Sequence, residues 1–167
     1  MTLRLPYSSK IGLLAALGSG ALLLGAYYFQ YVEKLAPCDL CYWQRWPHMV
    51  AIAVGLAAGA SFLQPGLAML FALLAITALL VTAGIGVFHV GVEYHWWQGP
   101  QACSGRAPSG LSDAELKKFL LGARMVRCDE PAWKMWNISM AGWNAILSGT
   151  LALVLSITVF NHVRAKT

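Results

Sequence analysis

The sequence predicts an all-α membrane protein, a four-helix transmembrane bundle with a short interfacial helix in its second outer loop. Of its 167 residues, 58% are hydrophobic and only 11% are charged, whereas an ordinary soluble domain carries about 25% charged residues. The length suits a single domain over 1–167. The net charge of +5 comes without a basic run or a basic–aromatic repeat, so we expect no nucleic-acid partner.

The predicted membrane spans follow from where charges are absent. A span needs about 20 apolar residues. No Asp, Glu, Lys or Arg occurs between Arg45 and Glu93, a stretch that is too long for one span and fits two. We expect the chain to turn back at Gln64-Pro65-Gly66, because proline followed by glycine is a strong turn signal. The four predicted spans are 11–32, 42–63, 67–92 and 143–160. The first is longer than the apolar region of 7–15 residues that is usual in a secretory signal peptide.

Small residues inside the predicted spans favour close helix packing. Gly55 and Gly59 form a G-x-x-x-G step, and Gly18, Gly20 and Gly25 occur in the first span. Small residues let membrane helices approach closely, and helix packing is a sufficient role for all five.

An even number of spans places both termini on one side of the membrane and the loops 33–41 and 93–142 on the other. Those loops or their edges hold all four cysteines, Cys38, Cys41, Cys103 and Cys128. Disulfides persist outside the cytosol, and Lys and Arg are denser in the short tails than in the long loop, which favours cytoplasmic tails. We therefore expect both termini in the cytoplasm and the cysteine loops outside it.

The long outer loop contains a predicted helix and a group of tryptophans. Ser112 and Glu115 form a capping box, and an apolar stripe with basic residues beside it follows at helical spacing. We expect this helix to lie on the membrane interface; a helix packed on its own loop is the alternative. Five tryptophans bracket the loop and fit an interfacial aromatic belt: Trp96, Trp97, Trp133, Trp136 and Trp143.

The two cysteine pairs favour redox chemistry. A bridge between Cys38 and Cys41 would constrain almost no chain, and a Cys-x-x-Cys motif tends to lower a thiol pKa. Cys103 and Cys128 enclose 24 residues, and a bridge there would stabilise the loop by about 3 kcal/mol on the chain-entropy model. Two disulfides on one face can pass electrons through mixed disulfides. A four-cysteine zinc site is the alternative, but zinc sites usually have a short motif in each half, so we expect no metal.

Charged and titratable residues near the first pair are candidates for the same site. Arg45 lies four residues after Cys41, so the two share a helical face, and a nearby guanidinium favours a thiolate. An arginine at mid-depth costs at least about 2.5–3.5 kcal/mol, which argues for a position near the surface; a snorkelling interfacial arginine is the alternative. His48 falls on nearly the same face, where a core role is favoured. His89 and Glu93 share a face and either line the same mouth or end the third span.

The joint arrangement carries a family resemblance. Four spans, Pro37-Cys38-x-x-Cys41 followed by Arg45, and a second cysteine pair between spans three and four resemble the bacterial inner-membrane disulfide bond formation protein B (DsbB) family. Further matches are Gly91-Val92-Glu93, Trp96-Trp97, Gly99-Pro100 with Cys103, and Cys128-Asp129-Glu130 with Trp133. Gln44 stands where some members carry an acid. The resemblance implies a single DsbB-like domain with redox loops at 33–41 and 93–142, in the bacterial inner membrane.

The resemblance also implies an enzyme, a protein-dithiol:quinone oxidoreductase, with a role for each cysteine. A periplasmic thioredoxin-fold oxidant (DsbA-like) would attack Cys103, and the freed Cys128 would attack Cys38. Cys41 would be released as a thiolate facing a membrane quinone, either ubiquinone or menaquinone, with Arg45 stabilising it and the bound ring. The quinone would accept two electrons as the first disulfide re-forms.

Three other classes of protein remain open from the residues alone, because the quinone enters only through the resemblance. One is a quinone-linked thiol enzyme of the vitamin K epoxide reductase type, which would run similar chemistry on an unrelated sequence order. Another is a tetraspan membrane protein with structural disulfides. The third is a metal-binding or metal-transport protein.

Overall fold

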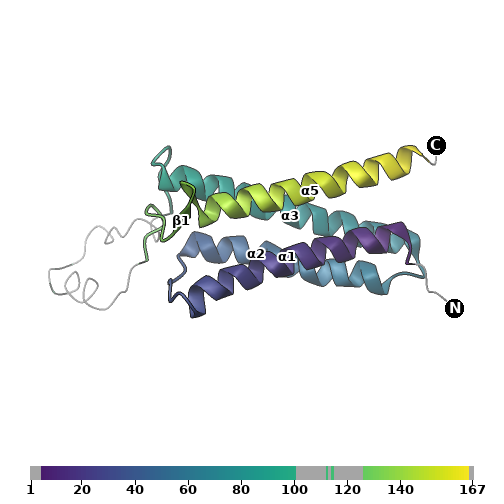
Figure 1. Ribbon diagram of the computed structural model, residues 1–167, viewed down its shortest axis with the longest axis horizontal. Helices are drawn as coiled ribbons and strands as arrows, with labels where there is room; N and C mark the ends of the chain where they lie inside the picture. Colours follow the sequence, from purple (N-terminus) through teal and green to yellow (C-terminus); the bar gives the residue numbers. More distant parts are fainter. Residues whose placement is uncertain (1–4, 101–111, 113, 115–125, 166–167) are drawn as a thin grey trace.

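The computed structural model describes residues 5–100, 112, 114 and 126–165 and is mostly helical in these parts (Figure 1). Four long helices run along a common axis, with the start of α1 and the end of α5 at one end and the described parts of the predicted cysteine loops at the other. The helices are α1 (Tyr7–Tyr31), α2 (Asp39–Ala60), α3 (Pro65–Glu93) and α5 (Met140–Arg164). Cys103 and almost all of the predicted interfacial helix after Ser112 lie outside the described residues.

Three of these helices, α1, α3 and α5, are long and apolar enough to cross a membrane. Helix α2 is not among them, although it has 22 residues. Its first half is comparatively polar because it contains Gln44, Arg45 and His48. The prediction of a mostly helical membrane protein is therefore confirmed, while the fourth span stays a prediction.

The turn between α2 and α3 lies earlier than predicted. Helix α2 ends at Ala60, and Pro65 is the first residue of α3 rather than part of the turn. Proline suits this position because the first amide of a helix has no partner within the helix and the proline ring already has a helical φ. The prediction of a turn at Gln64-Pro65-Gly66 was wrong by a few residues for that reason.

Side-chain caps set the starts of α2 and α5. Cys38 has extended backbone angles, and its Sγ accepts a hydrogen bond from the Cys41 amide at 3.3 Å. Ser139 caps α5 in the same way, with its Oγ accepting from the Gly142 amide at 3.1 Å. Each cap satisfies an amide that the first helical turn leaves free. Both helices consequently begin three residues before the predicted spans, and the cysteine motif forms the first turn of α2.

A small β hairpin precedes α5 and was not predicted. Strand β1 (Lys134–Met135) pairs antiparallel with β2 (Ile138–Ser139). The two residues between the strands have positive φ, 51° at Trp136 and 65° at Asn137. Two-residue hairpin turns of this kind require positive φ at both positions, and asparagine tolerates it. The hairpin holds the Trp136 region against the start of α5.

Small residues allow the helices to pack closely in pairs. A Cβ on Gly55 would meet the backbone of Gly12 and the side chain of Ala16, so α1 and α2 touch at this point. The G-x-x-x-G step therefore serves helix packing, as predicted. The same role was wrongly predicted for Gly20 and Gly25, because a Cβ at either position would meet nothing within 4 Å. Gly25 instead borders a cavity at the cysteine end of the bundle.

Candidate active site

Three of the four cysteines lie together where α2 begins and α3 ends. The Sγ atoms of Cys38 and Cys41 are 2.7 Å apart and share a hydrogen bond, and both are free thiols. Cys128 is disulfide-bonded. The Sγ atoms of Cys38 and Cys128 and a ring nitrogen of His89 all lie within 4.8 Å of one another. The two cysteine pairs of the sequence thus meet through Cys38 and Cys128.

Apolar packing holds the segment around Cys128 in place. Cys38, Leu40, Val92 and Cys128 form one buried cluster, with Val126 packed against it. The burial of Cys128 thereby ties a segment that precedes the hairpin to the first turn of α2 and the last turn of α3.

An ion-pair group flanks Cys128 in the sequence. Arg127 donates to both carboxylate oxygens of Asp129, at 2.9 and 2.8 Å, and lies 3.2 Å from Glu130. The hydrogen bonds from Arg127 lower the pKa of Asp129. Because Arg127 and Glu130 are exposed, solvent screens these ion pairs and limits what they add to stability.

The thiols of Cys38 and Cys41 differ in acidity. Both residues come before the predicted membrane span 42–63. The pKa of the Cys38 thiol is raised, first by its hydrogen bond to Cys41 and then by burial. The pKa of the Cys41 thiol is lowered, chiefly because Cys38 donates that hydrogen bond and to a smaller extent because Arg45 is positively charged. Cys41 is therefore the more acidic thiol of the pair, and Cys38 is the less acidic one.

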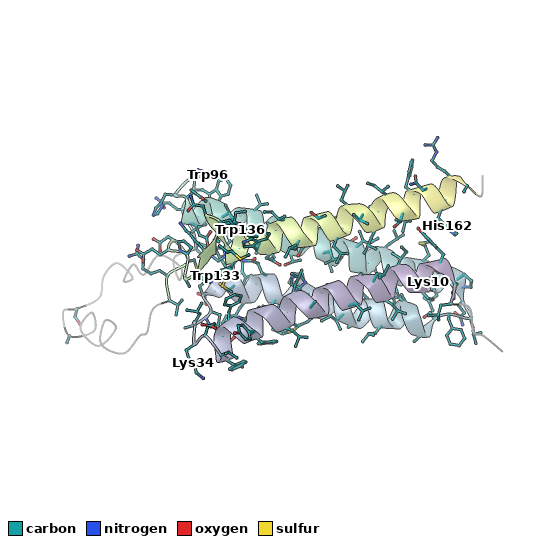
Figure 2. The ribbon with its side chains drawn as sticks, viewed as in Figure 1. Lys10, Lys34, Trp96, Trp133, Trp136 and His162 are labelled. Carbon is teal, nitrogen blue, oxygen red and sulfur yellow. The ribbon has the colours of Figure 1, made fainter. Side chains whose placement is uncertain are left out.

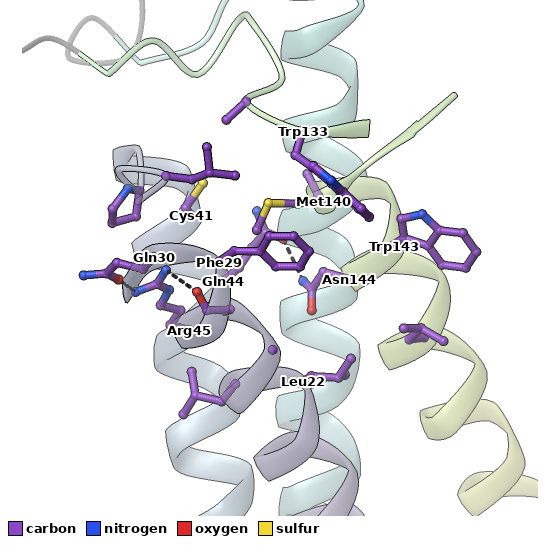
Figure 3. Close-up of a pocket in the computed structure, with 18 of the residues that line it drawn as sticks. Leu22, Phe29, Gln30, Cys41, Gln44, Arg45, Trp133, Met140, Trp143 and Asn144 are labelled. Atoms are coloured by element: carbon purple, nitrogen blue, oxygen red, sulfur yellow. Dashed lines mark hydrogen bonds between the residues drawn. The ribbon is translucent and has the colours of Figure 1, made fainter. Parts of the chain in front are cut away.

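Cys41 borders a cavity of about 680 Å³ that lies between α1, α2 and α5 (Figure 3). Its walls are mostly apolar, from side chains such as Leu22, Phe29, Trp133 and Met140. The polar side chains that reach it are few and come mostly from α2: Gln30, Cys41, Gln44, Arg45, His48 and Asn144. A mostly apolar cavity with a few placed polar groups is typical of a small-molecule site.

Arg45 lies in the wall of this cavity and is buried, with 7% of its surface exposed. Its guanidinium donates hydrogen bonds to the side chain of Gln30 and to the Ala26 carbonyl. It also lies over the rings of Tyr27 and Tyr42, with 5.1 and 5.2 Å between Cζ and the ring centroids. The interfacial snorkelling alternative does not fit this burial. Arg45 is instead a buried cation whose guanidinium has hydrogen-bond and aromatic partners, and it lies four residues after Cys41.

A buried group of polar side chains lies beside the cysteines. His89 and Glu93 were candidates from the sequence, but the roles of Gln44 and Asn144 were missed. His89, at the end of α3, has Nε2 3.7 Å from Cys38 Sγ and 3.9 Å from a Glu93 oxygen. Its Nδ1 lies 2.8 Å from the side-chain nitrogen of Gln44, which in turn contacts Asn144 of α5. The signal that could have found them is a polar residue within an apolar helix, where such residues mark functional sites.

The tryptophans that bracket the long loop differ in their surroundings. Figure 2 shows Trp96, Trp133 and Trp136 at the cysteine end of the bundle, while Lys10 and His162 lie at the opposite end. Trp96 and Trp136 are exposed, which suits the predicted aromatic belt. Trp133, Trp136 and Trp143 line the cavity, and Trp133 packs on Phe29 with 4.8 Å between ring centroids. The cavity therefore uses three of the rings that the sequence assigned to the membrane surface.

The sulfur–imidazole group of Cys38, His89 and Cys128 also has the residue types of a metal site. A cysteine binds zinc as a thiolate, and the sulfur of Cys128 is already in a disulfide. Structural zinc also takes four ligands, whereas this group offers three. The arrangement fits disulfide exchange better than the zinc alternative.

Comparisons with known proteins identify the family of the chain. The model of the family "Disulfide bond formation protein DsbB" matches residues 8–158. The disulfide bond formation protein B of Herminiimonas arsenicoxydans is 32% identical over 150 residues, covering 87% of this chain and 90% of the relative. That of Burkholderia pseudomallei (strain 1106a) is 30% identical over 173 residues, covering 97% and 95%. An uncharacterised protein of Rickettsia prowazekii is 28% identical over 137 residues, covering 81% and 78%. The chain belongs to the DsbB family.

Proposed function

We propose that this protein is a membrane thiol:quinone oxidoreductase that reoxidises a periplasmic DsbA-like dithiol and passes two electrons through its two cysteine pairs to a membrane quinone. Family membership assigns a role in disulfide bond formation. The arrangement of three cysteines supports the proposed path of the electrons to a quinone. Cys128 Sγ lies within 4.8 Å of Cys38 Sγ, and Cys41 borders the cavity.

The exchange begins with two disulfides, Cys103–Cys128 and Cys38–Cys41. A thiolate of the partner attacks Cys103, and Cys128 leaves as a thiolate. Cys128 attacks Cys38, forming a Cys38–Cys128 bond and releasing Cys41 as a thiolate. The partner's second thiolate then attacks the partner's first sulfur and displaces Cys103 as a thiolate. Cys103 attacks Cys128, which breaks the Cys38–Cys128 bond, releases Cys38 as a thiolate and restores the outer disulfide. The partner leaves oxidised, and its two electrons reside on Cys38 and Cys41.

The surroundings of Cys38 and Cys41 suit the order of exchange in which Cys38 is attacked and Cys41 leaves. A good leaving group in thiol–disulfide exchange is a thiol of low pKa. The Cys38 hydrogen bond, which is the largest cause of the lowered pKa of Cys41 in the reduced pair, is absent while Cys38 is in a disulfide, but the positive charge of Arg45 still lowers that pKa. Cys38 is buried beside Cys128 and is placed to be the sulfur that is attacked. Arg45 provides the positive charge near the leaving Cys41 thiolate.

The cavity fits a quinone. When bound, a quinone supplies a lipid-soluble acceptor of two electrons and two protons. The residues present match its parts: polar side chains at the Cys41 end face a ring with oxygens, while Leu22, Trp143 and Leu147 provide apolar wall for a tail. Ubiquinone and menaquinone share these features, and we propose either as the acceptor.

Helix α2 is proposed as the fourth span, with both termini cytoplasmic and the cysteine loops periplasmic. Its polar residues Gln44, Arg45 and His48 are buried inside the bundle. Its exposed face is apolar and includes Trp43, Trp46, Met49, Val50 and Leu56. Polar side chains in membrane helices face the bundle interior, so a low mean hydropathy does not prevent α2 from spanning. The termini also lie at the end opposite the cysteines.

A direct assay tests the proposed function. Purified protein is mixed with a reduced DsbA-like partner and a water-soluble ubiquinone analogue, and the quinone absorbance is followed. We expect quinone loss with the unsubstituted protein and none with Cys41→Ser. Absence of quinone loss with the unsubstituted protein would refute the enzyme and favour a tetraspan with structural disulfides. Loss that persists in Cys41→Ser would refute the roles of the cysteines.

A further inference from the structure

A buried chain of hydrogen bonds connects the cysteine group with the cavity. Gln44 contacts His89 on one side, at 2.8 Å, and Asn144 on the other, at 2.7 Å. The Asn144 oxygen lies 2.8 Å from Nε2 of His48. Gln44, His48 and Asn144 all line the cavity, and Figure 3 shows Gln44 and Asn144 in its wall. The chain thus ends on a histidine at the cavity, three residues beyond Arg45.

Backbone carbonyls fix the direction of every bond in this chain, because a carbonyl oxygen can only accept. The side-chain nitrogen of Gln44 donates to the Leu40 carbonyl at 3.3 Å, so the oxygen of Gln44 faces Asn144. The side-chain nitrogen of Asn144 donates to Gln44 and to the Thr82 carbonyl. The Asn144 oxygen therefore faces His48 as an acceptor.

This direction fixes the tautomer of His48. Nε2 must carry the hydrogen, because it meets an acceptor oxygen. A neutral imidazole has one N–H, so Nδ1 holds a bare lone pair. Nδ1 is buried and finds no hydrogen-bond partner among the described residues, and the whole residue is only 3% exposed. Buried polar atoms are nearly always paired, so an unpaired acceptor on a cavity-lining side chain indicates a ligand that donates.

We propose that Nδ1 of His48 accepts a hydrogen bond from a ring hydroxyl of the reduced electron acceptor, a quinol, bound in the cavity. This inference rests on the proposed function. A quinol hydroxyl carries a hydrogen, whereas a quinone carbonyl carries none, so the contact exists only after reduction. The electrons still come from Cys38 and Cys41 as they close to a disulfide. His48 is a positioning residue that makes the bound reduced form more stable than the oxidised form.

The test measures binding of the two redox forms separately. A Cys38→Ser/Cys41→Ser background prevents turnover, and the full-length protein is titrated without oxygen with decylubiquinone or decylubiquinol. Binding is followed by quenching of tryptophan fluorescence, since Trp133 and Trp143 line the cavity. One lost hydrogen bond corresponds to a factor of about five to ten in affinity. We expect the background protein to bind decylubiquinol more tightly than decylubiquinone.

Two substitutions provide a matched comparison. In His48→Gln the amide nitrogen takes the place of Nε2 and keeps the bond to Asn144, but nothing replaces Nδ1. In His48→Asn the amide group takes the place of Nδ1 and can still accept. We expect His48→Gln to lose about five- to tenfold in decylubiquinol affinity with little change for decylubiquinone, and His48→Asn to retain the preference for the reduced form.

Each other outcome has a distinct meaning. Equal losses for both forms in His48→Gln, or no loss for either, would refute the role of His48 while leaving the acceptor site intact. Failure of both forms to bind the background protein would refute the proposed function as well. A second measurement needs no substitution at His48: in protein with ¹⁵N-labelled histidine, the Nδ1 resonance of His48 must shift on addition of decylubiquinol and not of decylubiquinone. An unchanged resonance in both cases would overturn the proposal.

Discussion

Cys38 and Cys41 belong to one motif but have different surroundings. Cys38 caps α2 and lies against His89 and Cys128, in the buried cluster. Cys41, one turn into the helix, borders the cavity and shares its face with Arg45. The hydrogen bond between the two sulfurs raises one pKa and lowers the other. In this motif the less acidic thiol, Cys38, lies towards Cys128, and the more acidic thiol, Cys41, lies towards the cavity.

The acidity of Cys41 gives a prediction for alkylation of the reduced protein. Thiolates react and thiols do not, so Cys41 should react with N-ethylmaleimide at pH values below its ordinary pKa, with a rate that levels off once pH exceeds the lowered pKa. Cys38→Ala removes the largest cause of the lowering and Arg45→Met a smaller one. Both substitutions should move the midpoint of the pH–rate profile upward, Cys38→Ala further than Arg45→Met.

Two controls accompany this prediction. Cys38→Ser keeps a hydrogen-bond donor and Arg45→Lys keeps a positive charge, so both should shift the midpoint less than their partner substitutions. A larger shift in Arg45→Met than in Cys38→Ala would show that charge, rather than the hydrogen bond, sets the acidity of Cys41.

Sequence reasoning succeeded for residues whose relation is local. The four-residue spacing of Cys41 and Arg45 is enough to place them on one helical face, and the structure has them there. The contact of Gln44 with Asn144 joins residues 100 positions apart. This contact depends on which helices lie next to each other in the bundle. The hydrophobic patterns of apolar helices of similar composition do not predict which of them are neighbours. The contact of His89 with Cys38 depends on the same order of helices, so the sequence offered it only as one of two alternatives for His89.

At the level of elements, α1 and α2 approach each other closely at Gly12 and Gly55. The sequence predicted the helices because they are long and free of charges, but their ends are set by caps and by Pro65, which composition does not reveal. The hairpin escaped prediction because its turn, Trp136-Asn137, lacks the glycine that usually marks positive φ. Only the backbone shows that both residues adopt it.

Glycine substitutions test this helix packing. A Cβ on Gly55 would lie 2.4 Å from the Gly12 carbonyl oxygen and 2.9 Å from Ala16 Cβ. Gly55→Ala should therefore lower the free energy of unfolding by about 1–3 kcal/mol, the usual cost of overpacking. The control is Gly84→Ala in α3, where nothing lies within 4 Å and helix propensity predicts a gain of up to about 1 kcal/mol. Denaturant unfolding in detergent measures both, and equal effects would contradict the packing.

The hairpin gives a second test at this scale. Asn137→Val should destabilise the protein by about 1–3 kcal/mol, because a β-branched residue is strained at positive φ, whereas Asn137→Gly should be tolerated. The same unfolding measurement applies. If both variants match the unsubstituted protein, the hairpin makes no contribution to stability.

For the whole molecule, the bundle separates two ends of different chemistry. The described cysteines, the cavity and Trp96, Trp133 and Trp136 lie at one end, and the start of α1 and the end of α5 lie at the other. Such a separation suits a protein that takes electrons from a partner on one side of a membrane and delivers them within the lipid. The sequence predicted this division because all its cysteines fall in the two loops that an even number of spans places together.

Labelling from one side of the membrane tests this topology. In a cysteine-free background, Glu130→Cys should react with an impermeant maleimide in intact spheroplasts, because Glu130 is exposed at the cysteine end. Lys10→Cys, at the opposite end, should react only after the membrane is permeabilised. Reaction of both, or of Lys10→Cys alone, in intact spheroplasts would contradict the proposed orientation and the role of α2 as a fourth span.

The central claim is that electrons pass between the two pairs by exchange between Cys128 and Cys38. Disulfide mapping by mass spectrometry of the double variant Cys41→Ser/Cys103→Ser, which retains only these two cysteines, tests it most directly. Cys38→Ser/Cys103→Ser is the control, because its remaining cysteines, Cys41 and Cys128, are not exchange partners in this account and should cross-link far less. We predict one intramolecular Cys38–Cys128 disulfide per chain after mild oxidation. Two free thiols, or bonds formed only between chains, would contradict the account.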